Sequence, residues 1–423
     1  PDRNTDMTLV IDTPSLATGQ RSLAPQGQMF PLVPAQLKGC PATGSAEFQY
    51  PLEVTYDYGR AQPLRFAPGA GWADWAQLLP PRHPLASLPV GKTPLTDVSA
   101  LAPGQHQGRR IFVKDESRNP TWSHKDRLNT FTISAALYEG AHTVIVASSG
   151  NHGVSAAALA SRAGLNCIVL TMPSVSGAFR EMIHAYGALP LYLQADDRWP
   201  AMRVLQGLPG VYPVSNLTPV HTGHPWGPEG YKTIAYEILS DLDGMVPAAV
   251  VVPTGYGEML FGIWKGFREA MELGHIPRLP RLISVEPAAR GPLFHALAAN
   301  RPAVTVPASD TVQSGTGTTV NSFRAVLAMR ESQGLALLID DASALEAHRR
   351  LARQGLWLEV SSGAALAALD QVAPLEEEGP IILIGCSTGL KEPASAPGAL
   401  PQAVAPDLLA MRQRLKADYG LDL

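Results

Sequence analysis

Lys125 stands between a histidine and an aspartate in the stretch NPTWSHKDRL, directly after a proline turn and at the predicted start of a helix. If this helix start faces a cleft, burial disfavours the charged ammonium and lowers its pKa, and the free amine that results can attack a carbonyl carbon. The alternative is a solvated lysine beside Asp126 and Arg127, which is the usual state of a surface lysine. Lys125 therefore indicates covalent amine chemistry only if other parts of the chain supply a matching site.

Two glycine-containing turns have the residue types that bind anions. The stretch ASSGNHGVSAAALASRAG ends a predicted strand in Ser148 and Ser149 and then begins a helix, where hydroxyl groups, backbone N–H groups and the helix dipole suit a carboxylate. A plain capped turn uses the same residue types. In VVPTGYGEMLFGIWKG, Gly255 and Gly257 let the backbone approach a phosphate and direct successive N–H groups toward it. This second turn matches neither the dinucleotide fingerprint nor the Walker loop.

A fourth feature is the end of the last apolar run, ILIGCSTGLKEP, which carries Cys386, Ser387 and Thr388. In open parallel sheets, ligands bind beyond the carboxyl ends of the strands. All four features fall at such a position or at a helix start, so we expect them to form one site.

The elements that position these residues follow from an alternation of short β-branched runs with alanine-rich helical stretches, which predicts parallel strands joined by crossover helices. Strands are expected at 111–115, 143–148 and 166–172, and in a second series at 248–253, 281–287 and 381–386. The first hundred residues are rich in Pro and Gly, with 51–59 as the one convincing strand. We therefore expect an α/β protein with two parallel-sheet domains. The smaller α/β domain (106–225) would carry Lys125 and SSGNHG, and the large α/β domain (226–400) would carry the glycine turn. An N-terminal arm (1–105) would pack on the large domain, and a C-terminal tail (401–423) would follow it.

The composition narrows the range of partners. Of 423 residues, 45% are hydrophobic and 17% are charged, and the net charge is only -4 with no run of Lys or Arg, so the electrostatic footprint of a nucleic-acid binder is missing. No apolar run is long enough to cross a bilayer, and the first residues, PDRNTDMTLVID, have neither the basic start nor the apolar core of a secretory signal. Cys40, Cys167 and Cys386 form no CxxC pair, which argues against a disulfide framework or a structural zinc site. We expect a cytoplasmic protein that binds a small molecule and no metal, nucleic acid or membrane.

Taken in order, these motifs resemble the pyridoxal-phosphate enzymes of fold type II, the tryptophan synthase β-like fold, and within them the threonine synthase family. The similarity extends from PLEVTYDYG to GLKEP and passes through GKTPL, VKDESRNPTWSHKDR, SSGNHG, EGYKTIAYEI and WLEVSSGAALAAL. It implies pyridoxal 5'-phosphate as the cofactor, a cofactor site in the cleft between the two α/β domains, an amino-acid substrate and a homodimer.

The resemblance also implies roles for individual residues. Lys125 would form the Schiff base with the cofactor aldehyde, and Asn151 would hydrogen-bond the oxygen on the cofactor ring. Ser148, Ser149 and the residues that follow them, Asn151 and His152, would hold the substrate carboxylate. The turn that would hold the cofactor phosphate consists of Gly255, Tyr256, Gly257, Glu258 and Met259.

Cys386 takes the position that would face the nitrogen of the cofactor ring, with Thr388 as a near alternative. A neutral thiol or hydroxyl, unlike an aspartate, does not hold a proton on the pyridine nitrogen, so the ring is a milder electron sink. Expulsion of a β or γ leaving group is then favoured over transamination. Lys125, once released from the cofactor, is placed to remove and return protons at Cα.

Five positions depart from the family pattern, and three of them, Tyr256, Glu258 and Met259, stand in the phosphate turn where relatives often have Gly or Asn. His124 stands where Phe usually precedes the lysine, and His152 stands where Thr often follows the Asn, so SSGNHG is closer to serine and threonine ammonia-lyases. Each histidine is either an acid, base or substrate contact, or a packed and hydrogen-bonded side chain. Glu258 would repel a phosphate unless its side chain turns away and only its N–H points in.

Four functions remain open at this stage. The first is threonine synthase, with γ-elimination of phosphate from O-phosphohomoserine and addition of water at Cβ. Such an enzyme also needs a second anion site for the substrate phosphate, and the candidates for it are Arg127, Arg180 and Lys92. The second is β-elimination from serine or threonine to an oxo acid and ammonia. The third is β-replacement that makes an unusual amino acid, and the fourth is a non-catalytic relative that binds the cofactor or a metabolite.

Overall fold

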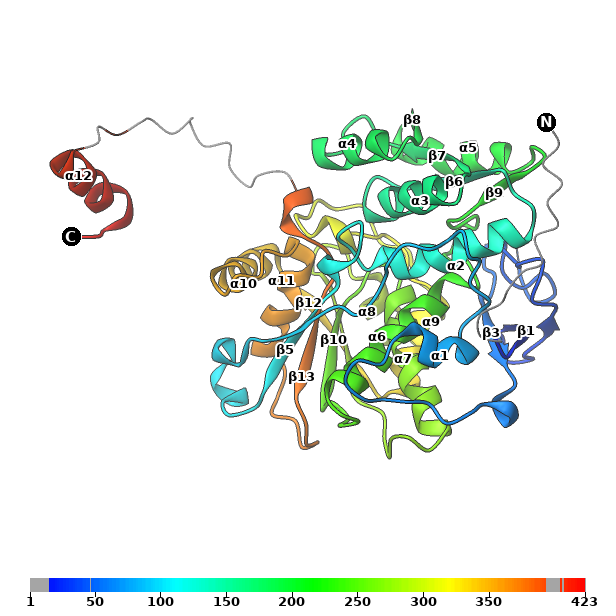
Figure 1. The fold of residues 1–423 in the computed structure, drawn as a ribbon, viewed down its shortest axis with the longest axis horizontal. Coiled ribbons are helices and arrows are strands. Elements are labelled where there is room, and N and C mark those ends of the chain that lie inside the picture. The colour runs from blue at the N-terminus through cyan, green and yellow to red at the C-terminus, as the bar shows by residue number, and fades with distance from the viewer. Residues whose placement is uncertain (1–14, 46, 393–403, 405–406, 423) are drawn as a thin grey trace. The chain divides into compact units, whose positions relative to one another are not determined.

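The computed structural model describes residues 15–45, 47–392, 404 and 407–422. Within these ranges, the residues up to Lys391 cluster into one compact unit, and those from Glu392 onward form a second. The first unit holds three sheets and the helices around them (Figure 1).

The largest sheet has six strands, in the order β12 (Leu335–Ile339), β11 (Arg281–Pro287), β10 (Ala249–Pro253), β13 (Ile381–Gly385), β5 (Ile111–Asp115) and β4 (Leu95–Asp97). Neighbouring strands are parallel except for β4 and β5, which are antiparallel. The runs AVVVP of β10 and IILIG of β13 are buried throughout, as expected for strands that helices cover on both faces. The helices of this part are α6 (Gly227–Asp241), α7 (Glu258–Glu272), α8 (Pro292–Ala298), α9 (Phe323–Glu331), α10 (Asp341–Arg353) and α11 (Val360–Ala367).

The second sheet is entirely parallel and has four strands, in the order β8 (Leu189–Tyr192), β7 (Asn166–Thr171), β6 (Thr143–Ala147) and β9 (Val211–Pro213). Its helices are α2 (Lys125–Tyr138), α3 (Asn151–Arg162), α4 (Gly177–Ala185) and α5 (Arg198–Leu205). Helix α2 packs against both α3 and α6, and so joins the two halves (Figure 1). Two parallel sheets with crossover helices confirm the predicted α/β class.

Strand β5 lies in a different sheet from the one that its place in the chain suggested. A boundary at residue 106 would put it in the smaller domain, but it pairs with β13, near the end of the chain, in the six-stranded sheet. The four-stranded sheet therefore begins with β6. An apolar run such as IFVKD specifies a buried strand but not its partner, so only the tertiary pairing decides this point.

The N-terminal arm has more strands than expected. Besides the predicted strand β3 (Leu52–Tyr56), it contains β1 (Ala17–Ser22) and β2 (Met29–Phe30), in an antiparallel sheet of order β2-β1-β3, and the short helix α1 (Trp72–Trp75). Val54 and Trp75 share an apolar core with Phe131 of α2 and Val144 of β6. The arm thus packs against the four-stranded half as well as the large domain.

The second compact unit contains helix α12 (Leu408–Tyr419). The side chain of Asp407 caps this helix by accepting a hydrogen bond from the Ala410 N–H at 2.8 Å. Most of the predicted tail linker, residues 393–406, lies outside the described residues.

Two further expectations concern membranes and cysteines. Among the described residues, no helix combines the length and the apolar character needed to span a bilayer. Cys40, Cys167 and Cys386 are free and buried.

Helix α6 carries charged side chains that have almost no access to water, because Glu229 and Lys232 are 0% exposed and Glu237 is 3% exposed. Burial of this kind is tolerated only with charge partners and hydrogen bonds. Lys232 Nζ lies 2.9 Å from Glu229 Oε2 and 3.0 Å from Glu269 Oε1 on α7. Lys265, also on α7, extends this set, since its Nζ lies 2.7 Å from Glu229 Oε1 and 3.2 Å from Glu53 Oε2. We call these residues the arm cluster: Glu53, Glu229, Lys232, Lys265 and Glu269.

Glu237 belongs to a second buried set, which ties α6 to α2 and β5. Arg127 on α2 places Nη1 2.7 Å from Glu237 Oε1 and Nε 2.6 Å from Glu116 Oε2. Lys114 on β5 places Nζ 3.0 Å from Glu237 Oε2. We call these residues the Arg127 cluster: Lys114, Glu116, Arg127 and Glu237.

We predict that Lys265→Met lowers the free energy of unfolding by about 3–5 kcal/mol, because it leaves the buried carboxylates of Glu53 and Glu229 short of a positive charge. Urea denaturation of the purified protein measures this loss. Arg349→Met is the matched control, because it breaks a pair with Glu346 in which both side chains are 57% exposed; it should cost less than about 1 kcal/mol. Equal effects of the two substitutions would contradict the stabilising role of the arm cluster.

Candidate active site

Lys125 is the first residue of α2, and the residue before it is attached to the end of β13. Both the backbone N–H and the ring Nδ1 of His124 lie 3.0 Å from the Cys386 carbonyl oxygen. A carbonyl only accepts hydrogen bonds, so Nδ1 carries the hydrogen and His124 is a packed, anchoring side chain. This contact brings Lys125 and Cys386, two of the predicted site residues, to the same place.

The amine of Lys125 is held by a neutral partner. Its Nζ lies 3.2 Å from the hydroxyl of Tyr231 on α6, and among the described residues no carboxylate lies within ion-pair distance of it. Burial lowers the pKa of Lys125, and Glu258, Cys386 and Glu359 oppose this shift only in part. The neutral, nucleophilic amine is therefore favoured more than in a solvated lysine.

The SSGNHG turn follows β6 and leads into α3, as predicted. Ser148 Oγ accepts a hydrogen bond from the Gly150 N–H at 3.2 Å. Ser149 Oγ accepts from Thr171 Oγ1 at 3.4 Å and from Arg198 Nη1 at 3.1 Å. Because both lone pairs of Ser149 are engaged, its hydroxyl hydrogen is available for an anion.

Asn151 begins α3 and lies in a buried polar network. Lys391 Nζ lies 2.7 Å from Asn151 Oδ1 and Ser387 Oγ lies 3.1 Å from it, while Nδ2 donates to Glu359 Oε2 at 3.2 Å. An amide nitrogen has two hydrogens, so one donor remains for a ligand oxygen.

Glu359 is a residue of this network that the sequence analysis did not single out. Burial raises its pKa, and Lys391, Asn151 and Lys125 oppose this shift in part. In the sequence, Glu359 reads as the cap of the helix that follows, α11, and its stretch WLEVSSG was a signal of the resemblance only.

The turn before α7 has unused hydrogen-bond donors, and its two glycines stand where a side chain would not fit. Gly257 has φ 90°, and a Cβ there would lie 2.3 Å from Ala325 Cβ; a Cβ at Gly255 would lie 3.1 Å from Thr318 Cγ2. The first-turn N–H groups of α7 have no acceptor within the helix. Thr318 Oγ1 is buried and has no hydrogen-bond partner among the described residues. These donors and the small cradle fit a phosphate group.

Glu258 lies in this turn, and its carboxylate points toward the loop before α6. Its Oε1 lies 3.4 Å from His221 Nε2 and 3.9 Å from Arg324 Nη1, in space that Gly223 leaves free. Burial by itself raises the pKa of Glu258, but His221, Lys125 and Arg324 lower it by more, so the net pKa lies below the usual range. The carboxylate thus has Arg324 and Lys125 as positive neighbours, which reduces the repulsion that Glu258 was expected to exert on a phosphate.

Two residues close to Glu258 in this turn, Tyr256 and Met259, have different contacts. The ring of Tyr256 stacks on the ring of His221 at 3.9 Å and 6°. Met259 is 6% exposed and packs in the core of the large sheet, so its side chain is structural.

His152 follows Asn151 and has a buried Nε2 with no hydrogen-bond partner among the described residues. Burial and the charge of Lys125 lower the pKa of His152 to about 3. The imidazole is therefore neutral near pH 7. It can donate or accept a hydrogen bond there, and its surroundings disfavour the charged, acidic form.

Cys386 is 2% exposed, and burial raises the pKa of its thiol well above the ordinary value, so the thiol is neutral. Its N–H donates to Ser362 Oγ at 2.8 Å. Thr388, the near alternative, is engaged locally, because its Oγ1 accepts from the Leu390 N–H at 3.3 Å. Cys386 also interacts electrostatically with Lys125, which favours Cys386 over Thr388 as the residue beside the ring nitrogen.

The three candidates for a second anion site differ in burial and in charge pairing. Arg127 is 0% exposed and all of its charge is paired within the Arg127 cluster, so it is unavailable to a ligand. Lys92 and Arg180 are exposed. Two cations contact the SSGNHG turn: Lys391, through Asn151, and Arg198, through Ser149. No sequence motif marked Arg198.

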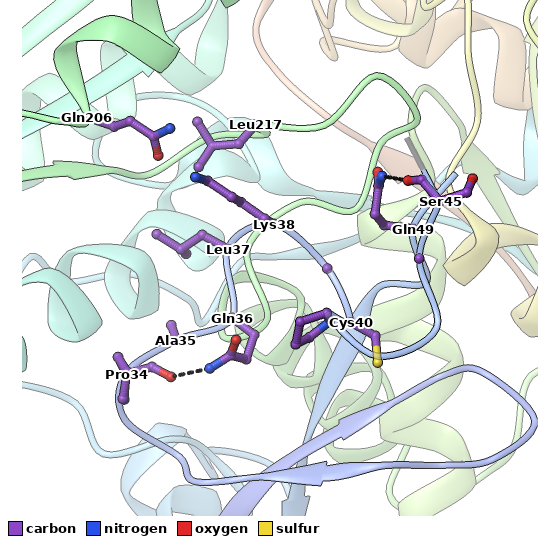
Figure 2. A pocket seen from close by; sticks show the side chains of 13 residues that line it. Pro34, Ala35, Gln36, Leu37, Lys38, Cys40, Ser45, Gln49, Gln206 and Leu217 are labelled. Atoms are coloured by element: carbon purple, nitrogen blue, oxygen red, sulfur yellow. Dashed lines mark hydrogen bonds between the residues drawn. The ribbon is translucent and has the colours of Figure 1, made fainter. Parts of the chain in front are cut away.

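Two hollows lie away from these residues. One, of about 510 Å³, is lined by arm residues from Pro34 to Gln49 together with Gln206 and Leu217, and the Lys38 side chain extends toward the latter two (Figure 2). The other, of about 960 Å³, lies beside β4 and β5 and includes His106 and Arg110. Neither contains a predicted site residue.

Comparisons with known proteins agree on one family. Residues 86–387 match the family model of the pyridoxal-phosphate dependent enzymes. Threonine synthase of Methanosarcina acetivorans is 32% identical over 358 residues, which cover 81% of this chain and 86% of that protein. Threonine synthase of Synechocystis sp. is 34% identical over 319 residues, which cover 74% and 80% of the two chains.

Solved structures of related enzymes have the same fold. The fungal L-serine ammonia-lyase from Rhizomucor miehei superposes with a TM-score of 0.63 at 20% identity, over 71% of this chain and 95% of that one. The T.th. threonine deaminase superposes with a TM-score of 0.60 at 25% identity, over 70% and 92%. With a family match over most of its length and a site built around an unpaired lysine, the chain belongs to the pyridoxal-phosphate-dependent enzymes of fold type II, and within them it is similar to threonine synthases.

Proposed function

We propose that the chain catalyses elimination and replacement on an amino-acid side chain, as a threonine synthase that converts O-phosphohomoserine and water to threonine and phosphate. The observation that carries the proposal is the Lys125 amine, which has a lowered pKa and no ion-pair partner among the described residues. The similarity to threonine synthases supports the choice of reaction.

The cofactor is pyridoxal 5'-phosphate, and the residues present suit it. Lys125 would hold it through a Schiff base, and the N–H groups of the 255–259 turn, with the unpartnered Thr318 hydroxyl, would hold its phosphate. The free Nδ2 hydrogen of Asn151 would reach the ring oxygen, and the neutral Cys386 thiol would face the ring nitrogen. When bound, the cofactor supplies an electron sink for negative charge at the substrate Cα.

The side chains of the protein would perform the remaining tasks. The hydroxyl groups of Ser148 and Ser149 and the first N–H groups of α3 hold the substrate carboxylate at the positive end of the helix dipole. The Lys125 amine removes a proton at Cα and returns it, because its lowered pKa leaves it free to accept one. The neutral Cys386 thiol would leave the ring nitrogen without a proton, and such a ring favours loss of a leaving group over transamination.

A second candidate is an ammonia-lyase that acts on serine or threonine. His152, in the SSGNHG turn, is the observation that favours it, together with the 25% identity to the threonine deaminase. The low pKa of His152 weighs against its acting as a charged acid. A β-replacement synthase and a non-catalytic relative have no observation of their own on these residues.

We further propose that the protein is cytoplasmic and works as a homodimer, in line with the composition and the resemblance to its family. Gel filtration with light scattering would test the second point.

The first prediction from this proposal concerns Lys125. Borohydride reduction of the purified yellow protein should fix the cofactor to Lys125 as a stable amine, and Lys125→Ala should lower kcat by at least about a hundredfold, because the acid–base group is lost. Peptide mapping reads the first result and steady-state kinetics the second. A label on Lys92, on Lys114 or on no lysine would contradict the assignment.

The second prediction concerns the ring nitrogen. Cys386→Asp should place a proton on that nitrogen, change the absorption of the bound cofactor and raise the fraction of turnovers that end in transamination. Absorption spectra and product mass report both effects. Thr388→Asp is the matched control and should change neither; the reverse pattern would assign the ring nitrogen to Thr388.

The third prediction separates the two candidate reactions through His152. As the imidazole is neutral, His152→Thr should reduce turnover of O-phosphohomoserine by less than about tenfold, since a hydroxyl also donates a hydrogen bond, and an essential acid is typically worth about a hundredfold or more. Kinetics on O-phosphohomoserine and on threonine measure this. If the enzyme does not turn over O-phosphohomoserine but deaminates threonine, and the variant loses a hundredfold there, the ammonia-lyase candidate replaces the synthase.

A further inference from the structure

Arg198 is held at two points and still presents unused donors. It is the first residue of α5; its Nη1 donates to Ser149 Oγ at 3.1 Å and its Nε donates to the Ala195 carbonyl at 3.3 Å. Neither bond uses Nη2, and the described residues contribute no partner to it. Since a guanidinium has five N–H donors in one plane, a preoriented edge remains for a bidentate acceptor.

Arg198 also has no counter-ion in the part of the chain that the structure describes. Among the described residues, no carboxylate oxygen lies within 4.0 Å of its guanidinium, in contrast to the paired charge of Arg127. The side chain is half-buried, and burial lowers its pKa, with Tyr256 and Asp196 in partial opposition. A partly desolvated cation of this kind gains when a ligand supplies the anion.

The position of Arg198 relates it to both anion-binding turns. Through Ser149 it contacts the turn that we propose for the substrate carboxylate, and it is close enough to Tyr256 of the 255–259 turn to interact electrostatically with it. The α-carboxylate already has the Ser148 and Ser149 hydroxyls and the start of α3. An additional cation between the two turns is therefore suited to a further negative group on the same ligand.

We propose that Arg198 binds a second anionic group, carried on the side chain of the amino-acid substrate, through its free N–H edge. This inference rests on the proposed function and deepens it, because it names the residue that would select amino acids with a side-chain phosphate or carboxylate. It assigns the specificity role to Arg198 in place of Arg127, Arg180 and Lys92. Planar, bidentate recognition of such groups is the chemistry for which arginine is better suited than lysine.

The test compares two ligands that differ only in the side-chain anion. Holoenzyme is titrated with O-phospho-L-serine and with L-serine, and binding is followed by the absorption of the cofactor. Arg198→Gln should raise Kd for O-phospho-L-serine by about tenfold or more and leave Kd for L-serine within about twofold, because only the first ligand loses charged hydrogen bonds. Arg203→Gln, an exposed arginine on the same helix, is the control and should change neither value.

A conservative variant keeps the test decisive if Arg198→Gln does not fold. Arg198→Lys retains the charge but not the fork, so it should weaken O-phospho-L-serine by about threefold or more, less than the glutamine variant, and leave L-serine unchanged. Equal weakening of both ligands would mean that Arg198 serves the α-carboxylate, and no weakening of either would mean that it serves no anion; both results overturn the inference while the proposed function stands. If the cofactor is bound to Lys125 but neither ligand, nor O-phosphohomoserine, changes its absorption, the proposed function itself fails and the inference fails with it.

Discussion

The burial of charge on helix α6 constrains the rest of the molecule. Glu229, Lys232 and Glu237 have almost no access to water, so each needs partners that only other segments can supply. The arm cluster ties α6 to α7 and to strand β3 of the N-terminal arm, and the Arg127 cluster ties it to α2 and β5. Elements from the first two thirds of the chain are therefore held against one helix by interactions that fail if any partner moves away.

This constraint also explains why Lys125 is chemically free. Its three nearest neighbours all have structural contacts: His124 binds the Cys386 carbonyl, Asp126 accepts from the Thr121 N–H at 2.7 Å, and Arg127 is locked to Glu116 and Glu237. The backbone on both sides of the lysine is thus fixed from opposite directions. The Lys125 amine has no ion-pair partner among the described residues, and it meets the Tyr231 hydroxyl that the same α6 helix carries.

Charges near the 255–259 turn also depend on whether the fold supplies a partner of opposite sign. A carboxylate at Glu258 is compatible with a neighbouring phosphate only because His221 and Arg324 draw it toward the loop before α6, and Gly223 leaves the space. Arg198 presents the opposite case, a cation whose anion the described residues do not provide. In one case the fold neutralises a charge internally, and in the other it leaves the neutralisation to a ligand.

The local sequence predicted the apolar strands, helix starts close to Lys125, Asn151 and Glu258, and the α/β class, because hydrophobic periodicity and glycine or serine turns act over a few neighbouring residues. The motifs at these helix starts were also enough to suggest the family. What the local pattern left open are properties that depend on residues far apart in the chain: the sheet to which β5 belongs, the loss of Arg127 as a ligand and the gain of Arg198, the direction of the Glu258 carboxylate, and the pKa of His152. Strand partners, ion pairs and desolvation depend on contacts between residues that are distant in the chain. No short stretch of the sequence specifies those contacts.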